Sequence, residues 1–146
     1  MANEAWTILD KLYTVLDALT CLREVRMEFG TEETEIAATK TPACAILVYE
    51  IEESEEGVVA DATEVQQNVH FTLQICVSEK NEKERVRSLI ELGNAIRNAV
   101  GGDATLRAYK TVLGSMAHAA TEDDAPTVVA AIPGWARIMH LTNTGR

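Results

Sequence analysis

Strict alternation of apolar and polar residues over Gln66–Val77 constrains this chain more than any other feature of its sequence. Successive side chains of a β-strand point to opposite faces, so this run predicts a long strand with one buried face. A strand of this length is typical of the centre of an antiparallel sheet that is covered on one side. The apolar positions are Val69, Phe71, Leu73, Ile75 and Val77. The alternating positions hold His70, Thr72, Gln74 and Cys76.

Two amphipathic helices are predicted to cover that sheet, over residues 4–20 and 81–100. Both segments place apolar residues three and four positions apart, which puts them on one helix face. The first stripe is Ala5, Ile8, Leu9, Leu12, Val15, Leu16 and Leu19, and the second is Val86, Leu89, Ile90, Gly93, Ile96 and Val100. Asn81 or Ser78 is a candidate cap for the second helix, and Gly101-Gly102 is predicted to end it.

Shorter alternating or apolar runs predict the remaining strands. Residues 22–29 alternate, and Ala43–Ile51 is almost continuously apolar after Pro42, so each reads as a strand joined by a polar loop over 30–41. The segment Glu50–Gly57 is so rich in glutamate that we expect a solvated hairpin tip or loop there.

The C-terminal third has a weaker pattern. Thr105–Ala119 is predicted as one strand and Ala120–Pro126 as a turn. A final strand follows over 127–132 and 135–141, bent or bulged at Pro133-Gly134. Proline lacks the N–H that a central strand donates, which argues against a central position for this stretch. The order predicts one α+β domain over residues 1–146, a mostly antiparallel sheet with two helices on one face.

Composition narrows the class of function. The 146 residues carry a net charge of -10, and an acidic surface repels the phosphate backbone, so tight nucleic-acid binding is not expected. The three cysteines are widely spaced and form neither a disulfide framework nor a zinc signature, which indicates reduced thiols. We recognise neither a signal peptide nor a membrane-spanning run.

Catalytic and ligand-binding motifs are also not recognised. The sequence contains no phosphate-binding loop and no nucleophile elbow. His70, His118 and His140 stand in different predicted strands, so a metal site would have to be assembled from distant segments. Cys44 and His70 on neighbouring strands are a geometrically possible pair, but Cys44 lies in an apolar run where a thiol is inert. We therefore predict no catalytic residue, cofactor or metal.

Two features are candidates for contacts with partners. The first is the acidic cluster Glu50, Glu52, Glu53, Glu55 and Glu56, which lacks the spacing of a calcium loop and is expected to be solvated. The second is Trp6, which lies beside the main helix stripe and suits an exposed interface position. We expect Trp135, next to the predicted bulge, in the core.

The order of elements carries a family resemblance over nearly the whole chain. The segments concerned are Trp6–Leu19, Thr41–Val48, His70–Val77, Asp103–Leu106 and Pro126–Leu141. Their succession resembles the phage tail terminator and tail-completion proteins, including the minor tail protein U type of long-tailed phages. One difference is that Gly101-Gly102 precedes the Asp-x-Thr-Leu stretch, whereas similar proteins often have a glycine pair after it. A neck adaptor or another tail-associated protein is therefore an alternative.

The resemblance implies a structural protein of the virion that catalyses no reaction. Members form a homo-oligomeric ring, typically a hexamer, on the head-proximal end of the tail tube, where it stops tube growth and joins tail to head. Its partners would be the tail tube protein and head-tail connector proteins, and DNA would pass through the lumen without specific binding. Assembly would take place in the host cytoplasm. The rival hypothesis is a small α+β enzyme or dimeric ligand-binding module with a site built from His70 and neighbouring strands.

Overall fold

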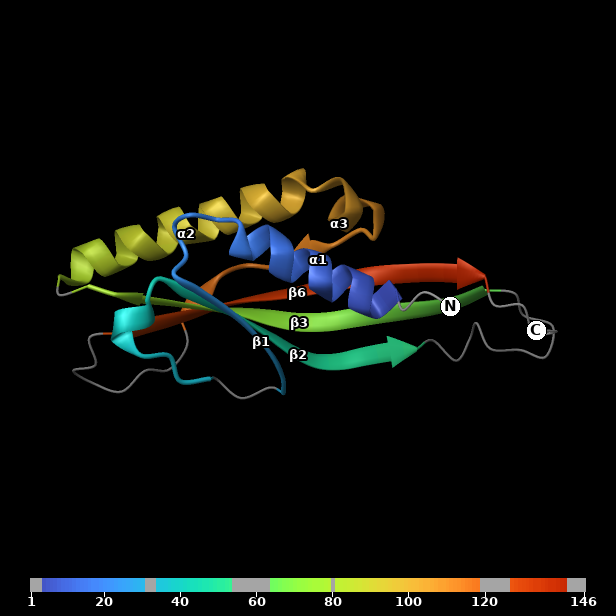
Figure 1. Cartoon of the computed structure of the whole chain (residues 1–146), viewed down its shortest axis with the longest axis horizontal. Coiled ribbons are helices and arrows are strands. Elements are labelled where there is room, and N and C mark those ends of the chain that lie inside the picture. The colour runs from blue at the N-terminus through green and yellow to red at the C-terminus, as the bar shows by residue number, and fades with distance from the viewer. Residues whose placement is uncertain (1–3, 31–33, 54–63, 80, 119–126, 142–146) are drawn as a thin grey trace.

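The computed structural model describes residues 4–30, 34–53, 64–79, 81–118 and 127–141. These residues form one layer of helices on one β-sheet (Figure 1). The helical elements are α1 (Glu4–Asp17), η1 (Ala38–Lys40), α2 (Glu82–Gly102) and α3 (Ala104–Ala108). The strands are β1 (Glu24–Phe29), β2 (Ala43–Glu53), β3 (Glu64–Ser78), β4 (Val112–Leu113), β5 (Ala117–His118) and β6 (Thr127–Leu141).

The predicted α+β class is confirmed, and β3 is the central strand as its alternation indicated. The sheet order is β1-β2-β3-β6-β4, and β5 also pairs with β6. All described pairings are antiparallel except β1 with β2, which is parallel. The parallel pairing is possible because the segment after β1 returns along the sheet before β2 begins, instead of making a hairpin.

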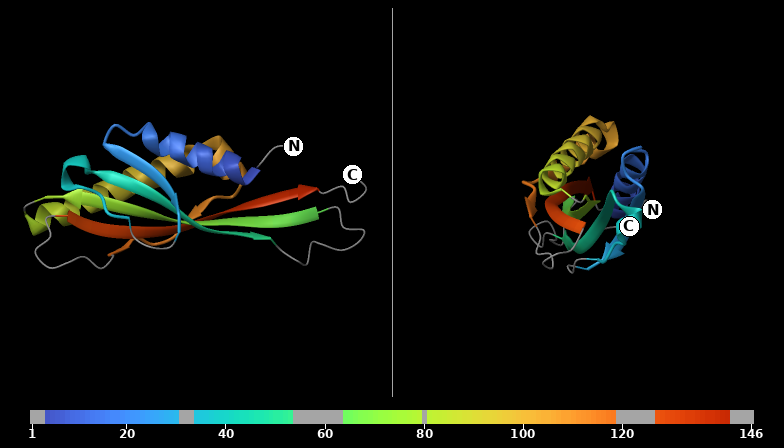
Figure 2. Two further views of the ribbon diagram at one scale, coloured as in Figure 1. Left: turned by 60° about the horizontal axis from the view of Figure 1, so that its bottom comes forward. Right: turned by 90° about the vertical axis from the view of Figure 1, so that its left-hand side faces the viewer.

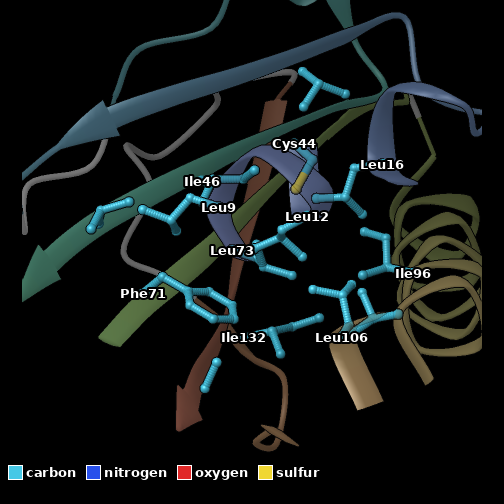
Figure 3. Close-up of a cluster of buried hydrophobic side chains, with 14 of the residues drawn as sticks. Leu9, Leu12, Leu16, Cys44, Ile46, Phe71, Leu73, Ile96, Leu106 and Ile132 are labelled. Atoms are coloured by element: carbon cyan, nitrogen blue, oxygen red, sulfur yellow. The ribbon is translucent and has the colours of Figure 1, made fainter. Parts of the chain in front are cut away.

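The helices cover one face of the sheet and bury the alternating apolar residues of β3 (Figure 2). Figure 3 shows Leu12 and Leu16 of α1 and Ile96 of α2 closing over Leu73 and Cys44. All five residues are fully buried. The stripe of α1 was therefore read correctly, although the helix ends at Asp17, three residues earlier than predicted.

The predicted stripe of α2 is wrong at two residues of its first half, whereas Leu89 packs against the core. Val86 and Ile90 are 54% and 50% exposed, and the buried residues are confined to Leu92–Val100. The N-terminal half of α2 extends beyond α1 and α3, so neither of these two helices packs beside it (Figure 1). Asn81 does cap the helix, accepting hydrogen bonds from the N–H groups of Lys83 and Glu84. The helix does end at the predicted glycine pair, because Gly101 and Gly102 are the last two residues of α2.

The segment Thr105–Ala119 is not one strand, which corrects the sequence prediction. It contains α3 and the short strands β4 and β5. Asp103 causes this change, because its carboxylate accepts a hydrogen bond from Leu106 N–H at 3.0 Å and so begins a new helix. Leu106 is then fully buried beneath α1 and α2. A third helix thus joins the two that were predicted. The predicted turn Ala120–Pro126 lies outside the described residues.

Replacement of Asp103 by alanine is expected to lower the free energy of unfolding by about 1–2 kcal/mol. Most of this is the lost α3 cap, because capping residues contribute about 0.5–2 kcal/mol. The ion pair of Asp103 with Lys11 (3.5 Å) adds little, since the Lys11 side chain is partly exposed to solvent. Urea unfolding measures the change. Asp103→Asn keeps a capping oxygen and removes the charge, so equal destabilisation by both variants would contradict a capping role.

Pro133 was expected away from the sheet interior, and this expectation is wrong. The strand β6 runs unbroken beside β3, with Pro133 opposite Thr72 in a continuous register and without a bulge. On its other side, β4 pairs with Gly134 and Trp135 while β5 pairs with Ala130 and Ala131. Pro133 lies in the gap between these two short strands, where its missing N–H interrupts neither ladder. Its carbonyl still accepts a hydrogen bond from Gly114 N–H at 2.7 Å.

Part of the sheet face without helices is covered by the segment before β2. Ile36 packs there with Ala43, Ala45, Leu47, Cys76 and Val129. Gln74, which is 2% exposed, accepts a hydrogen bond from Thr34 N–H at 2.8 Å and donates one to Thr34 C=O at 2.6 Å. Residues 34–41 of the predicted loop are therefore already fixed on the sheet. The rest of the helix-free face contains the candidate site.

Candidate functional site on the helix-free face

A β-bulge in β2 shapes the candidate site. Val48 pairs with Phe71, but the next pair joins Glu50 to His70, so Tyr49 is an extra residue. A bulge reverses the side-chain alternation that follows it. Glu50 and Glu52 consequently lie on the helix-free face with His70, while Ile51 pairs with Val69 on the helix-covered side.

The length of β2 corrects the prediction of a hairpin tip or loop at the acidic segment. The strand β2 continues to Glu53, so Glu50–Glu53 are paired with β3 and are not a hairpin tip. Glu55 and Glu56 lie outside the described residues. Of Glu53, the structure describes only the backbone, which pairs with Gln67.

Glu50, Glu52 and His70 converge at one point of the helix-free face. One ligand-capable atom from each lies within 4.8 Å of the others. His70 Nε2 lies 3.8 Å from Glu50 Oε1, which is too long for a hydrogen bond. Asn68 Nδ2 donates a hydrogen bond to Glu52 Oε1 at 3.0 Å, which orients that carboxylate. The ring of Tyr49 packs on the imidazole, with 5.9 Å between ring centroids.

An apolar row crosses the helix-free face at the same level. The apolar row consists of Tyr49, Trp135 and Val112, whose side chains are 38%, 40% and 41% exposed. Trp135 of β6 pairs with Val112 of β4 on one side and with His70 of β3 on the other, so His70 separates Trp135 from Tyr49 of β2. Trp135 is thus not a core residue as predicted, because the unbroken register of β6 turns it away from the helices.

A second apolar surface lies at the opposite side of the fold, between α1 and the edge strand β1. The α1–β1 groove encloses about 320 Å³ and is lined by Trp6, Asp10, Tyr13, Val25, Arg26 and Met27. Trp6 is 54% exposed, in agreement with its predicted surface position. Phe29, 78% exposed at the end of β1, extends this apolar surface. Because Phe29 alternates with buried Val25, the pattern suggested that Phe29 is buried too, but within the described part of the chain β1 is the edge strand of the sheet.

The suggested pairing of Cys44 with His70 is excluded. Cys44 lies among the helix-covered core residues (Figure 3). His70 alternates in β3 with the core residues Val69 and Phe71, so its side chain is on the other face of the sheet. Burial, and to a smaller extent nearby Cys76, raises the pKa of the Cys44 thiol to about 12, so it is protonated at neutral pH. His118 and His140 stand in β5 and β6, so the three histidines do belong to different strands.

Sequence patterns did not predict that Asn68, Tyr49 and Val112 belong to this region. Asn68 alternates with Val69 and was visible only as a polar strand residue. The bulge at Tyr49 has no glycine or proline to mark it. Val112 does lie in a strand as predicted, but this strand is the two-residue β4 and not a strand over Thr105–Ala119. Only the pairing of β2, β3, β6 and β4 brings these residues beside His70.

Comparisons with known proteins assign no family. No protein-family model matches the chain, and no curated protein matches it either. Among the helices that the structure describes, none is both long and apolar enough to cross a membrane.

Proposed function

We propose that this protein is a structural subunit that assembles into a homo-oligomeric ring of the tail terminator kind. The observation that carries the proposal is the presence of two separate apolar surfaces, the α1–β1 groove and the apolar row. They lie on different sides of one chain. Exposed groups of large apolar side chains are typical of protein–protein contacts.

Two different surfaces favour a head-to-tail contact between copies. A contact of this kind joins unlike patches, and it produces a closed ring when the rotation between copies closes. Trp6 and Trp135 are suited to anchor it, because tryptophan is enriched among residues that dominate binding energy. The edge strand β1, whose outer side pairs with no other described strand, adds backbone groups that a neighbouring chain can pair.

Charge and element order support the more specific assignment to a tail. The net charge of -10 makes a lumen formed by this chain repel DNA, so DNA would pass without binding. The order of elements resembles tail terminator proteins, which implies a place at the head-proximal end of the tail tube. Its partners there would be the tube protein and head-tail connector proteins.

Light scattering on the purified chain, followed by electron microscopy, tests the proposal. We expect a mass near six times the 16.0 kDa of one chain and a ring with an open centre. A monomer at micromolar concentration that does not bind a tail tube end would contradict the ring. A monomer would favour the alternative, a ligand-binding module, for which the convergence of Glu50, Glu52 and His70 is the specific observation.

A further inference from the structure

We propose that Glu50, Glu52 and His70 form a binding site for a borderline divalent metal ion such as Zn²⁺. The three side chains come from two paired strands, and their ligand-capable atoms lie within 4.8 Å of each other. Tetrahedral zinc ligands at about 2.0–2.1 Å from the metal are separated by about 3.4 Å. Because Glu50 is exposed, a rotamer change can provide the required contraction.

The state of His70 is an independent sign of a ligand. Its Nε2 atom is buried and has no hydrogen-bond partner among the described residues. Buried polar atoms are nearly always paired with protein, water or an ion, so Nε2 is available to a ligand from outside the described residues. Nε2 lies 3.8 Å from Glu50 Oε1, so a metal ion between them would satisfy both atoms.

Neighbouring side chains contact the proposed metal ligands His70 and Glu52. The tilted ring of Tyr49 lies beside the imidazole, and Asn68 orients Glu52 through its amide. Such outer contacts are typical of metal sites, where they fix the direction of the ligand atoms. The bulge at Tyr49 is the element that turns both carboxylates toward the imidazole.

The ligand types select the class of metal. An imidazole nitrogen suits zinc, copper, nickel or iron, whereas calcium requires six to eight oxygen atoms. Three protein ligands leave one tetrahedral position open to water or another donor. The inference concerns binding by a single chain and does not depend on ring formation, so either proposal can fail without the other.

Isothermal titration of the full chain with Zn²⁺ alone, in metal-free buffer, tests the site. We expect about one ion per chain. His70→Phe keeps an aromatic ring beside Tyr49 and should weaken binding at least tenfold. Asn68→Ala removes only the orienting contact, and loss of such contacts costs about 10–100-fold in affinity. Glu28→Gln, at an exposed glutamate of β1, is the matched control and should bind like the unmodified chain.

Absorption spectroscopy with Co²⁺ distinguishes binding at this site from nonspecific adsorption of ions to an acidic surface. Co²⁺ bound to this site should give the visible absorption of a four-coordinate ion, and Zn²⁺ should displace it. Circular dichroism establishes that each variant is folded. Equal Zn²⁺ affinity of His70→Phe and Glu28→Gln, or the absence of binding by the unmodified chain, would overturn the proposal. If His70→Phe does not fold, the Zn²⁺ affinity of Asn68→Ala is compared with that of Glu28→Gln instead, and equal affinities would overturn the proposal.

Discussion

Trp135→Thr is expected to leave the chain folded but unable to form the ring. The indole is 40% exposed and central to the apolar row, and threonine suits a strand position. Loss of an anchoring tryptophan costs about 2 kcal/mol or more at an interface, which weakens each contact roughly thirtyfold. Light scattering at micromolar concentration should therefore show the mass of a single chain. Trp6→Ala should act in the same way from the other surface, because alanine is compatible with α1.

A mixture of the two variants gives the sharper result. Trp135→Thr keeps its α1–β1 groove, and Trp6→Ala keeps its apolar row, so one intact contact can form between unlike partners. We expect a heterodimer that cannot grow further. If the mixture contains only single chains, the two surfaces do not bind each other. Val86→Thr, at an exposed residue of α2 outside both surfaces, is the control that should assemble normally.

Gly134→Val is expected to destabilise the folded chain by about 3 kcal/mol. A Cβ atom at Gly134 would lie 2.5 and 2.6 Å from two ring carbons of Phe71, and 3.0 Å from Cδ2 of Leu113. Phe71 is the cross-strand partner of Gly134 and is fully buried, so its ring has no open space to enter. Overpacking of this kind costs about 1–3 kcal/mol, and the branched side chain of valine falls at the upper end.

Urea unfolding of matched glycine variants measures this effect. Gly134→Ala should also destabilise, although alanine otherwise gains about 0.5–1 kcal/mol over glycine in regular structure. Gly101→Ala is the control, because a Cβ there meets no atom within 4 Å, and it should stabilise α2 by a similar amount. Phe71→Leu should cost less in the Gly134→Ala background than alone. Equal effects of the two alanine variants would contradict the clash.

The elements that the sequence predicted well are those with long, regular patterns. Alternation placed β3 at the centre of the sheet, and the stripe of α1 identified its buried face, because side-chain period follows directly from backbone geometry. The pattern misled in α2, since an apolar stripe is buried only where another element covers it. It also misled after Asp103, where a single capping carboxylate outweighs the weak alternation of the following residues.

The candidate site depends on pairing between strands, and periodicity carries little information about pairing. His70 and the glutamates were visible as residue types, but the face on which Glu50 and Glu52 lie changes with one extra residue. The bulge at Tyr49 and the unbroken register of Pro133 were decided by contacts between distant segments. By itself, then, the sequence determined the α+β class, the central strand and the exposure of Trp6. The tertiary structure decided that Glu50, Glu52 and His70 meet and that Trp135 faces outward, because a register shift of one residue turns a side chain to the other face.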